Sequence, residues 1–294
     1  MSEFGFSSTA EDVTEGVSLE GKTILITGCN SGIGLESARV LAKRGAHIIG
    51  LARSVEKAEA ALSSVGINGT AVACDLSEPK EVLKSVQTVL ALAKKIDVLL
   101  CNAGIMALPE RQEKYGLELQ FLTNHMGHFL LVTGLVDALT KNGRVVMLSS
   151  GAHFMADKEI GIDFDDLGGE NYEPWKQYGQ SKLANLLFAR SLAKQFSEDK
   201  GNKRSANAVH PGVIRTNLTR HIGGEVFDSM DQTSIKTIAQ GAATQCFVAV
   251  QPRGGQLSGT YFSDCHEAKC SKWGKDDALA ERLWKKSEEL AASF

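Results

Sequence analysis

The strongest constraint in this sequence is an alternation of short apolar runs with longer helical patterns, which continues from about residue 20 to the C-terminus. The apolar runs predict strands at 22–27, 46–51, 70–74, 96–101, 143–148, 205–209 and 260–262. The stretches between them predict helices at 32–44, 54–64, 78–94, 112–139, 174–196, 235–250 and 276–292. Continuous apolar strands that alternate with helices form parallel sheets covered on both faces. We therefore expect one α/β domain over residues 21–294, with a doubly wound parallel sheet of about seven strands.

Charge and hydropathy exclude several classes of protein. The chain carries 32 Lys and Arg against 35 Asp and Glu, a net charge of −3, whereas a nucleic-acid footprint is strongly basic. The longest apolar run, at 129–136, is interrupted and too short to cross a bilayer. Residues 1–20 are polar and acidic, without the regions of a secretory signal. We expect a flexible tail there, no membrane anchor, no nucleic-acid partner and a cytoplasmic location.

The six cysteines are scattered, so the chain is not a disulfide scaffold. Cys265, His266 and Cys270 lie close together in the sequence and could suggest a metal. Because no second pair of such residues stands at zinc spacing, we expect no metal site.

A glycine-rich turn joins the first predicted strand to the first helix, with the sequence Thr-Gly-Cys-Asn-Ser-Gly-Ile-Gly at 27–34. Gly28 permits a tight turn, Gly32 lets backbone approach a pyrophosphate, and Gly34 lets helix and strand pack closely. The N–H groups that open the helix attract phosphates. A glycine-rich turn without a ligand is the alternative, but the place of this turn at the start of a βαβ unit favours a dinucleotide.

The end of the second strand indicates which nicotinamide cofactor binds. An NAD site usually has Asp or Glu there, and residues 50–54 contain no carboxylate. Arg53 could pair with a 2′-phosphate and Ser54 could donate to it, which favours NADP(H) over a merely solvated arginine. Asp75 and Leu76 follow the third strand, where the carboxylate could accept from an adenine amino group or cap the next helix.

Tyr178 and Lys182 stand four residues apart and share one face of a predicted helix. A nearby ammonium lowers the pKa of a tyrosine from about 10, so Tyr178 could exchange a proton with a substrate oxygen. Ser150 follows the fifth strand and could bind the same oxygen. Asn124 is polar within an apolar helix and could hold a water that links Lys182 to solvent.

Together these motifs resemble the short-chain dehydrogenase/reductase family, over nearly the whole chain from about residue 20. The resemblance also rests on Cys101-Asn102-Ala103-Gly104 and on Pro211-Gly212-Val213-Ile214-Arg215-Thr216. It implies a Rossmann fold. It also implies that Tyr178 is the acid/base, that Lys182 binds the nicotinamide ribose and lowers the Tyr178 pKa, that Ser150 orients the carbonyl, and that Asn124 supports a proton relay.

The cofactor contacts implied by the motifs and the resemblance come from the strand ends and from the catalytic pair. They are Gly28, Asn30, Ser31, Gly32, Ile33, Gly34, Arg53, Ser54, Asp75, Leu76, Asn102, Ala103, Gly104, Tyr178, Lys182, Pro211, Gly212, Val213 and Thr216. The resemblance places Val213 at the nicotinamide carboxamide and Thr216 towards the phosphates.

The gap between Ser150 and Tyr178 exceeds the family's usual spacing and predicts an insertion at 152–175 beside the active site. With the motifs at 124–129, 181–185 and 261–265, the insertion resembles the retinol dehydrogenase-like branch, which includes WW-domain oxidoreductases. The expected substrate contacts are Ser150, His153, Phe154, Trp175 and Tyr178. Residues 217–237 are predicted to form a substrate lid.

We therefore expect NADP(H)-dependent, reversible hydride transfer between nicotinamide and a carbonyl or alcohol, with a lipophilic aldehyde or ketone as substrate. Reduction of C=N or C=C bonds and a non-catalytic sensor of NADP(H) are the alternatives. The resemblance also implies a homodimer or homotetramer paired through 112–139 and 174–196. His125 and His128 could be ligands, although packing or interface roles are favoured.

Overall fold

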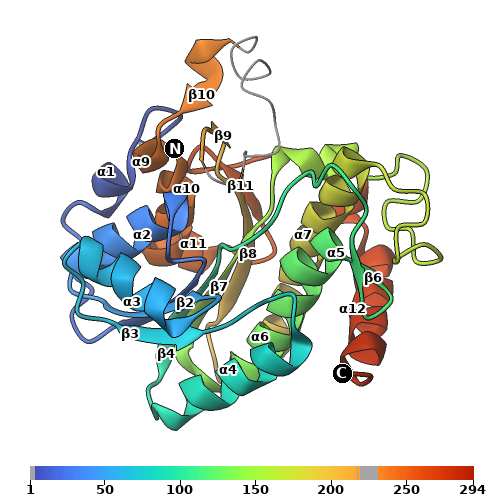
Figure 1. The fold of residues 1–294 in the computed structure, drawn as a ribbon. Coiled ribbons are helices and arrows are strands. Elements are labelled where there is room, and N and C mark those ends of the chain that lie inside the picture. Colours follow the sequence, from blue (N-terminus) through green and yellow to red (C-terminus); the bar gives the residue numbers. More distant parts are fainter. Residues whose placement is uncertain (1–3, 217, 219–230) are drawn as a thin grey trace.

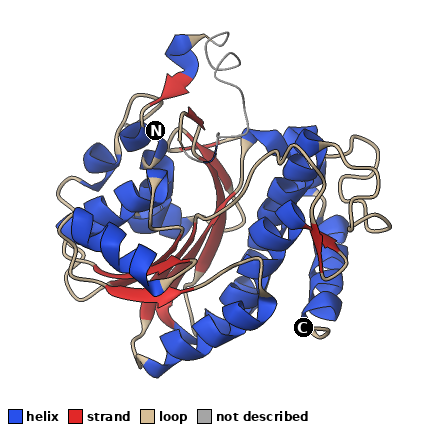
Figure 2. Ribbon diagram, in the orientation of Figure 1, coloured by secondary structure: helices blue, strands red, loops and turns tan. Residues whose placement is uncertain are grey.

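The computed structural model describes residues 4–216, 218 and 231–294, and its centre is a twisted sheet with helices on both faces (Figure 2). Seven parallel strands stand in the order β11-β8-β7-β4-β1-β2-β3, and β12 adds an antiparallel edge. Their bounds are β1 Thr23–Thr27, β2 His47–Ala52, β3 Thr70–Ala73, β4 Ile96–Cys101, β7 Leu139–Leu148, β8 Ser205–His210, β11 Tyr261–Ser263 and β12 His266–Glu267. The predicted α/β, doubly wound fold is confirmed.

Side chains along each strand alternate between two cores, one on each face of the sheet. In β1, Ile24 and Ile26 enter one core and Leu25 enters the other. The core of Leu25 lies under α4 Pro79–Ala91, α6 Gly127–Leu135, α7 Pro174–Glu198 and α12 Asp277–Ala291. The opposite core lies under α2 Gly32–Lys43, α3 Val55–Ser64 and α10 Ala243–Val250 (Figure 1). Because helices cover both faces of the sheet, a ligand can reach it only at the ends of the strands, between the two helix layers.

Smaller elements complete the described residues. They are the helices α9 Ile238–Gly241 and α11 Pro252–Gln256, the short strands β9 Val213–Ile214 and β10 Ile235–Lys236, and the 3₁₀ turns Gly151–Met155, Gln232–Ser234 and Trp273–Lys275. The helix predicted over 235–250 is therefore divided, because Ile235 and Lys236 pair in parallel with Val213 and Ile214. Most of the predicted lid at 217–237 lies outside the described residues. None of the helices in the described part of the chain combines the length and apolar character needed to cross a bilayer.

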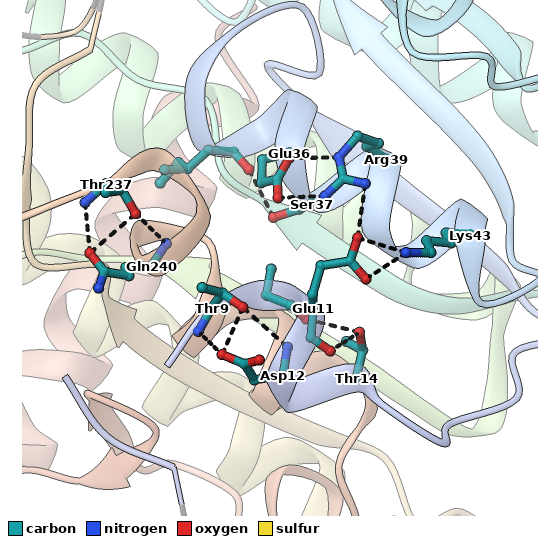
Figure 3. A network of polar contacts seen from close by, with 12 residues as sticks. Thr9, Glu11, Asp12, Thr14, Glu36, Ser37, Arg39, Lys43, Thr237 and Gln240 are labelled. Carbon is teal, nitrogen blue, oxygen red and sulfur yellow. Dashed lines mark hydrogen bonds and ion pairs between the residues drawn. The ribbon is translucent and has the colours of Figure 1, made fainter. Parts of the chain in front are cut away.

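The prediction of a flexible tail is wrong for residues 4–20. They contain the helix α1 Ala10–Thr14, whose first turn is closed by a capping box between Thr9 and Asp12. Ala10 and Val13 share one helix face and are buried in the core under α2 and α10. Glu11 forms ion pairs with three cations from α2 and the residue after it, as Figure 3 shows in part: Arg39 at 2.9 Å, Lys43 at 3.1 Å and Arg44 at 3.2 Å.

The single helix predicted over 112–139 is also wrong. The segment begins with the hairpin strands β5 Glu113–Lys114 and β6 Leu117–Glu118, joined by Tyr115 and Gly116, which both have positive φ. The short helix α5 Leu119–Phe121, a π-helical turn Leu122–Met126 and α6 follow, and Val136–Ala138 form a 3₁₀ turn. The apolar periodicity of 119–135 predicts a helix, but it does not extend across the Tyr-Gly turn that precedes it.

The insertion at 152–175 packs against the first turns of α7. A Cβ at Gly179 would lie 2.6 Å from the carbonyl oxygen of Ala152, so the two segments are in direct backbone contact. The Gln180 side chain accepts from the N–H of Asp163 at 2.8 Å, and Lys176 pairs with Asp157 at 2.8 Å. The insertion is therefore tied to the helix that carries Tyr178.

Candidate active site

The glycine-rich loop leaves the carboxyl end of β1 and opens helix α2. Ser31 is the extended N-cap residue of α2, and its side chain makes no capping hydrogen bond, so the first N–H groups of the helix remain open to an anion. A Cβ at Gly34 would lie 2.2 Å from the carbonyl oxygen of Gly28 and 2.5 Å from Nδ2 of Asn102. Only glycine fits this position, and the close approach fixes the shape of the loop.

The loops after β1 and β4 are joined by hydrogen bonds. The Thr27 Oγ1 accepts from the N–H groups of Asn102 at 2.9 Å and Ala103 at 3.0 Å. Nδ2 of Asn102 donates to the carbonyl oxygen of Thr27 at 2.9 Å. The next residue, Gly104, faces the catalytic side, since a Cβ there would lie 3.4 Å from Nζ of Lys182. Residues 102–104 therefore connect the glycine-rich loop to the catalytic residues.

The loop 211–216 follows β8 and also reaches the glycine-rich loop. A Cβ at Gly32 would lie 3.6 Å from the Cβ of Thr216, and a pocket of about 390 Å³ is lined by Gly32, Arg215, Thr216 and Ile238. The parallel pairing of β9 with β10 holds this loop. Arg215 was not predicted as a cofactor contact. Its place beside Thr216 in the Pro211–Thr216 motif was the signal available in the sequence.

The carboxyl end of β2 lies directly beside the glycine-rich loop. The N–H of Gly28 donates to the carbonyl oxygen of Leu51 at 2.8 Å, so Arg53 follows two residues after a contact with the loop. Arg53 is exposed, and its guanidinium takes part in no ion pair or hydrogen bond within the described part of the chain. Ser54 is the N-cap residue of α3, where its hydroxyl accepts from the N–H of Lys57 at 3.4 Å.

Asp75 does not cap helix α4, whose N-cap residue is Glu78. The Asp75 carboxylate instead accepts from the N–H of Ser77 at 2.9 Å and from its hydroxyl at 2.7 Å. Leu76 is buried, and its carbonyl oxygen would lie 2.4 Å from a Cβ at Gly127, so α6 begins in close contact with this turn. Of the two roles considered for Asp75, the helix cap is therefore wrong because the turn continues for three more residues, and the contact with adenine stays a prediction.

Ser150, Tyr178 and Lys182 meet at the carboxyl end of β7. Tyr178 is 4% exposed and has the Ser150 hydroxyl as a hydrogen-bond partner. Nζ of Lys182 lies 5.6 Å from the centroid of the Tyr178 ring and donates to the carbonyl oxygen of Leu148 at 3.0 Å. The arrangement places a phenol, a hydroxyl and an amine on one side of the strand end, where they can bind a small polar group and move a proton.

Burial moves the two central pKa values in opposite directions. It raises the pKa of Tyr178, and the hydrogen bond with Ser150 offsets part of this effect. It lowers the pKa of Lys182 to about 7. The predicted lowering of the Tyr178 pKa by Lys182 is therefore not found among the groups of the chain itself, because desolvation disfavours both charged forms.

Asn124 lies in the π-helical turn, a feature often found at functional sites. Its Oδ1 accepts from the N–H of Ile105 at 2.8 Å, and its Nδ2 donates to the carbonyl oxygen of Ile105 and to Oγ of Ser181, each at 2.9 Å. Both amide hydrogens are engaged, so a water bound by this side chain has to donate to Oδ1. Asn124 also connects the loop after β4 to helix α7.

The predicted substrate residues differ in exposure. His153 is only 1% exposed, and its Nδ1 donates to the carbonyl oxygen of Ser150 at 2.6 Å while its Nε2 accepts from the N–H of Ser271 at 3.0 Å. It therefore holds the backbone of Ser150 and does not face a substrate. Phe154 and Trp175 are 52% and 38% exposed. The Trp175 ring meets that of Tyr178 edge-on at 6.1 Å.

Comparisons with known proteins agree with this architecture. A family model for short chain dehydrogenases matches residues 22–161. The chain is 41% identical to the short-chain dehydrogenase TIC 32 A of Brassica napus, over 99% of this chain and 95% of the relative. It is 39% identical to retinol dehydrogenase 12 of Mus musculus, over 94% and 88%. The solved structure of an uncharacterised protein from Mycobacterium paratuberculosis superposes with a TM-score of 0.79 at 32% identity, covering 98% of both chains.

Proposed function

Because the chain belongs to the short-chain dehydrogenase family, in its retinol dehydrogenase-like branch, we propose that it is an NADP(H)-dependent oxidoreductase that interconverts carbonyls and alcohols. Members of this family are oxidoreductases that use a nicotinamide cofactor. The observation that carries the proposal is the cluster of Ser150, Tyr178 and Lys182 at the end of β7, which is joined to the glycine-rich loop through residues 102–104.

The residues present fit a dinucleotide with a 2′-phosphate. The uncapped N-terminus of α2 offers N–H groups to a pyrophosphate, and Arg215 and Thr216 line the adjoining pocket. Arg53 brings an exposed guanidinium to the end of β2, where NAD-binding chains carry a carboxylate. A guanidinium binds a phosphate dianion with paired, charge-assisted hydrogen bonds, which supports NADP(H) over NAD(H).

The chain's own side chains supply binding and proton transfer. The bound cofactor supplies the hydride. The Ser150 hydroxyl donates a hydrogen bond to the substrate oxygen, and the Tyr178 hydroxyl gives that oxygen a proton during carbonyl reduction. In the reverse direction Tyr178 takes the proton from the alcohol. Lys182 lies 5.6 Å from the Tyr178 ring, and its protonated form favours the phenolate that forms when the proton leaves.

We propose a lipophilic aldehyde or ketone as the preferred substrate. Met106 and Ala107 pack against Tyr178 in a small apolar cluster. Phe154 of the insertion and Trp175 in the first turn of α7 add exposed apolar surface. The names of relatives such as retinol dehydrogenase 12 describe an apolar alcohol as the substrate of those proteins.

The test is a titration of the purified protein with NADPH and NADH, followed by a panel of aldehydes and ketones of increasing apolar size. Loss of the reduced-nicotinamide absorbance should be faster with NADPH and with the larger apolar carbonyls. The Tyr178→Phe variant should still bind NADPH but lose turnover by about 10²–10⁴-fold, because it has no proton to transfer. Turnover restricted to imines or enones, or NADPH binding without any turnover, would reject the carbonyl proposal.

We further propose that the protein acts in the cytoplasm as a homodimer or homotetramer. Helix α12 lies across the helices predicted to pair subunits, since the Trp284 ring stacks on Phe188 of α7 at 5.6 Å and meets Phe129 of α6 at 5.2 Å. A pairing surface on this side therefore has to include the outer face of α12. Light scattering of the purified protein and fractionation of its source cells test the two statements, and a monomer or an organelle location rejects them.

A further inference from the structure

Two buried histidines lie three residues apart around the π-helical turn, and the proposed reaction uses neither. His125 and His128 are both 0% exposed. Nε2 of His128 lies 2.9 Å from Oγ1 of Thr27, and its Nδ1 lies 2.8 Å from the carbonyl oxygen of Asn124. The imidazole of His128 therefore touches one residue from the cofactor side of the site and one from the catalytic side.

The hydrogen-bond partners determine which nitrogen of His128 carries the proton. The carbonyl oxygen of Asn124 can only accept, so Nδ1 must be the donor. Both lone pairs of the Thr27 hydroxyl already accept from the N–H groups after β4, so this hydroxyl must donate to Nε2. The ring is consequently neutral, with its hydrogen on Nδ1. Burial lowers the pKa of His128 to about 4, which is consistent with a neutral ring near pH 7.

The two partners of His128 organise different halves of the site. Thr27 holds the backbone of residues 102–103 beside the glycine-rich loop. Asn124 holds the backbone of Ile105 and the hydroxyl of Ser181, which in turn donates to the carbonyl oxygen of Tyr178 at 2.8 Å. Through His128, a continuous series of hydrogen bonds runs from the end of β1 to the helix that carries Tyr178.

We propose that His128 is a positioning residue which, as the neutral Nδ1–H tautomer, holds the glycine-rich loop and the loop after β4 in register with the catalytic turn of α7. Its expected effect on turnover rests on the proposed function, whereas its effects on loop position and cofactor affinity do not. This role requires a side chain with one hydrogen-bond acceptor and one donor, separated by about the width of an imidazole ring. An apolar side chain of similar size has neither.

His125 provides a matched control. It lies in the π-helical turn just before α6 and is equally buried, but its Nε2 contacts Oγ of Ser287 on α12 at 2.9 Å, away from the cofactor loops. Replacing His128 by Phe removes two buried hydrogen bonds, replacing His125 by Phe removes one, and both variants test packing in the same buried segment. Only the variant at position 128 removes a connection between the two halves of the site.

The experiment compares His128→Phe, His128→Gln and His128→Asn with His125→Phe, and measures NADPH affinity by fluorescence titration. His128→Phe should weaken NADPH binding by about tenfold or more, the size expected for one unsatisfied buried polar group, while His125→Phe changes it less than about twofold. Gln can place an acceptor where Nε2 stands and should recover most of the affinity. Asn reaches only the Nδ1 position, so it should not.

A second measurement keeps the proposal testable if these variants fold poorly. Imidazole ¹⁵N spectra of the wild-type protein should show His128 as a neutral Nδ1–H tautomer between about pH 6 and 9. An Nε2–H tautomer, a charged ring, or equal losses of NADPH affinity in His125→Phe and His128→Phe would overturn the proposal. Because neither readout needs turnover, a wild-type protein that reduces no carbonyl would reject the proposed function and leave this test intact.

Kinetics separate positioning from general destabilisation. In the variants that fold, His128→Phe should raise the KM for NADPH and lower kcat, because both loop position and the Tyr178 turn are disturbed. His125→Phe should lower thermal stability with kcat and KM near those of the wild type. Unchanged NADPH KM in a folded His128→Phe protein would count against the positioning role.

Discussion

The two halves of the candidate active site are built differently. On the cofactor side, the turns after β1 and β4 approach so closely that a single added methyl group at Gly34 would lie 2.2 Å from a backbone oxygen. On the substrate side, Phe154 of the insertion and Trp175 in the first turn of α7 have 52% and 38% of their surface exposed. The backbone of the first half leaves no room for a larger residue at Gly34, whereas the second half presents exposed side chains on its surface.

The difference follows from where each half lies in the fold. The cofactor loops are short connections at the end of a parallel sheet, fixed by strand register and by hydrogen bonds such as those of Thr27. The insertion connects β7 to α7 through turns, and its contacts with α7 include those of Gln180, Lys176 and the backbone at Gly179. Substitutions should therefore have large effects on the cofactor side and selective ones on the substrate side.

The largest effect is expected for Gly34→Ala. The added Cβ has no room between the Gly28 carbonyl and the Asn102 amide, so the loop must shift or the helix must move away from β1. We expect a loss of stability of about 3 kcal/mol, at the upper end for overpacking, and no measurable NADPH binding. Urea denaturation and fluorescence titration measure the two effects.

The control is Gly5→Ala, where a Cβ meets nothing within 4 Å. It should leave stability and NADPH affinity unchanged. A Gly34→Ala protein that binds NADPH like the wild type would show that the cofactor side is as adaptable as the substrate side.

Arg53→Ala tests whether the cofactor side also discriminates between NADPH and NADH. Removing the guanidinium should weaken NADPH binding by about 10–100-fold, the range for a lost charge-assisted contact, because the 2′-phosphate loses its partner. NADH affinity should change by less than about twofold, since NADH has no phosphate there. Parallel titrations with both cofactors measure the ratio, and an equal loss for both would assign Arg53 a structural role.

The sequence predicted the backbone of the glycine-rich loop more fully than the surroundings of the substrate-side residues, for a physical reason. Glycines at fixed spacing after an apolar strand require one backbone path, so the loop at 27–34 could be placed from its residues alone. The role of His153 depends on a residue distant in the sequence, because the N–H of Ser271 donates a hydrogen bond to its Nε2. The N-terminal helix was missed because its core contacts come from one short face within a polar segment.

The segment 112–139 shows the same limit of sequence-based prediction over a longer stretch of the chain. Apolar periodicity indicates a buried helix but not where it begins, and the hairpin turn at Tyr115 and Gly116 was hidden within it. The roles of Asn124 and His128 depended on the π-helical turn, which places their side chains between β1, β4 and α7. No spacing rule in the sequence gives that turn.

Lys182 connects the two halves, and its burial predicts a dependence of stability on pH. The unfolded chain takes up a proton on this lysine at a pKa of 10.5, whereas the folded chain does so at about 7. Between these values the unfolded state holds one more proton, so the stabilisation present above pH 10.5 is lost as the pH falls towards 7. Lys182→Met has no such proton, and its stability should not show this contribution.

The free energy of unfolding of the wild type, relative to Lys182→Met, should therefore rise by about 2 kcal/mol between about pH 7.5 and pH 9.5. Urea denaturation at the two pH values measures the difference, with the exposed Lys57→Met as the control. A constant difference between wild type and Lys182→Met would mean that the buried amine does not titrate in this range.

The smallest effect is expected on the substrate side, for Trp175→Ala. The ring meets Tyr178 edge-on at 6.1 Å, so it can contact the apolar part of a substrate without touching the reacting oxygen. Its removal should raise KM for a large apolar aldehyde by about fivefold, equivalent to roughly 1 kcal/mol of apolar contact, and leave NADPH affinity unchanged. Steady-state kinetics with a large and a small aldehyde separate the two effects, and Leu90→Ala, an exposed apolar residue of α4, is the control. An equal change for both aldehydes would assign Trp175 to the support of Tyr178 and would remove the distinction between a rigid and an adaptable half of the site.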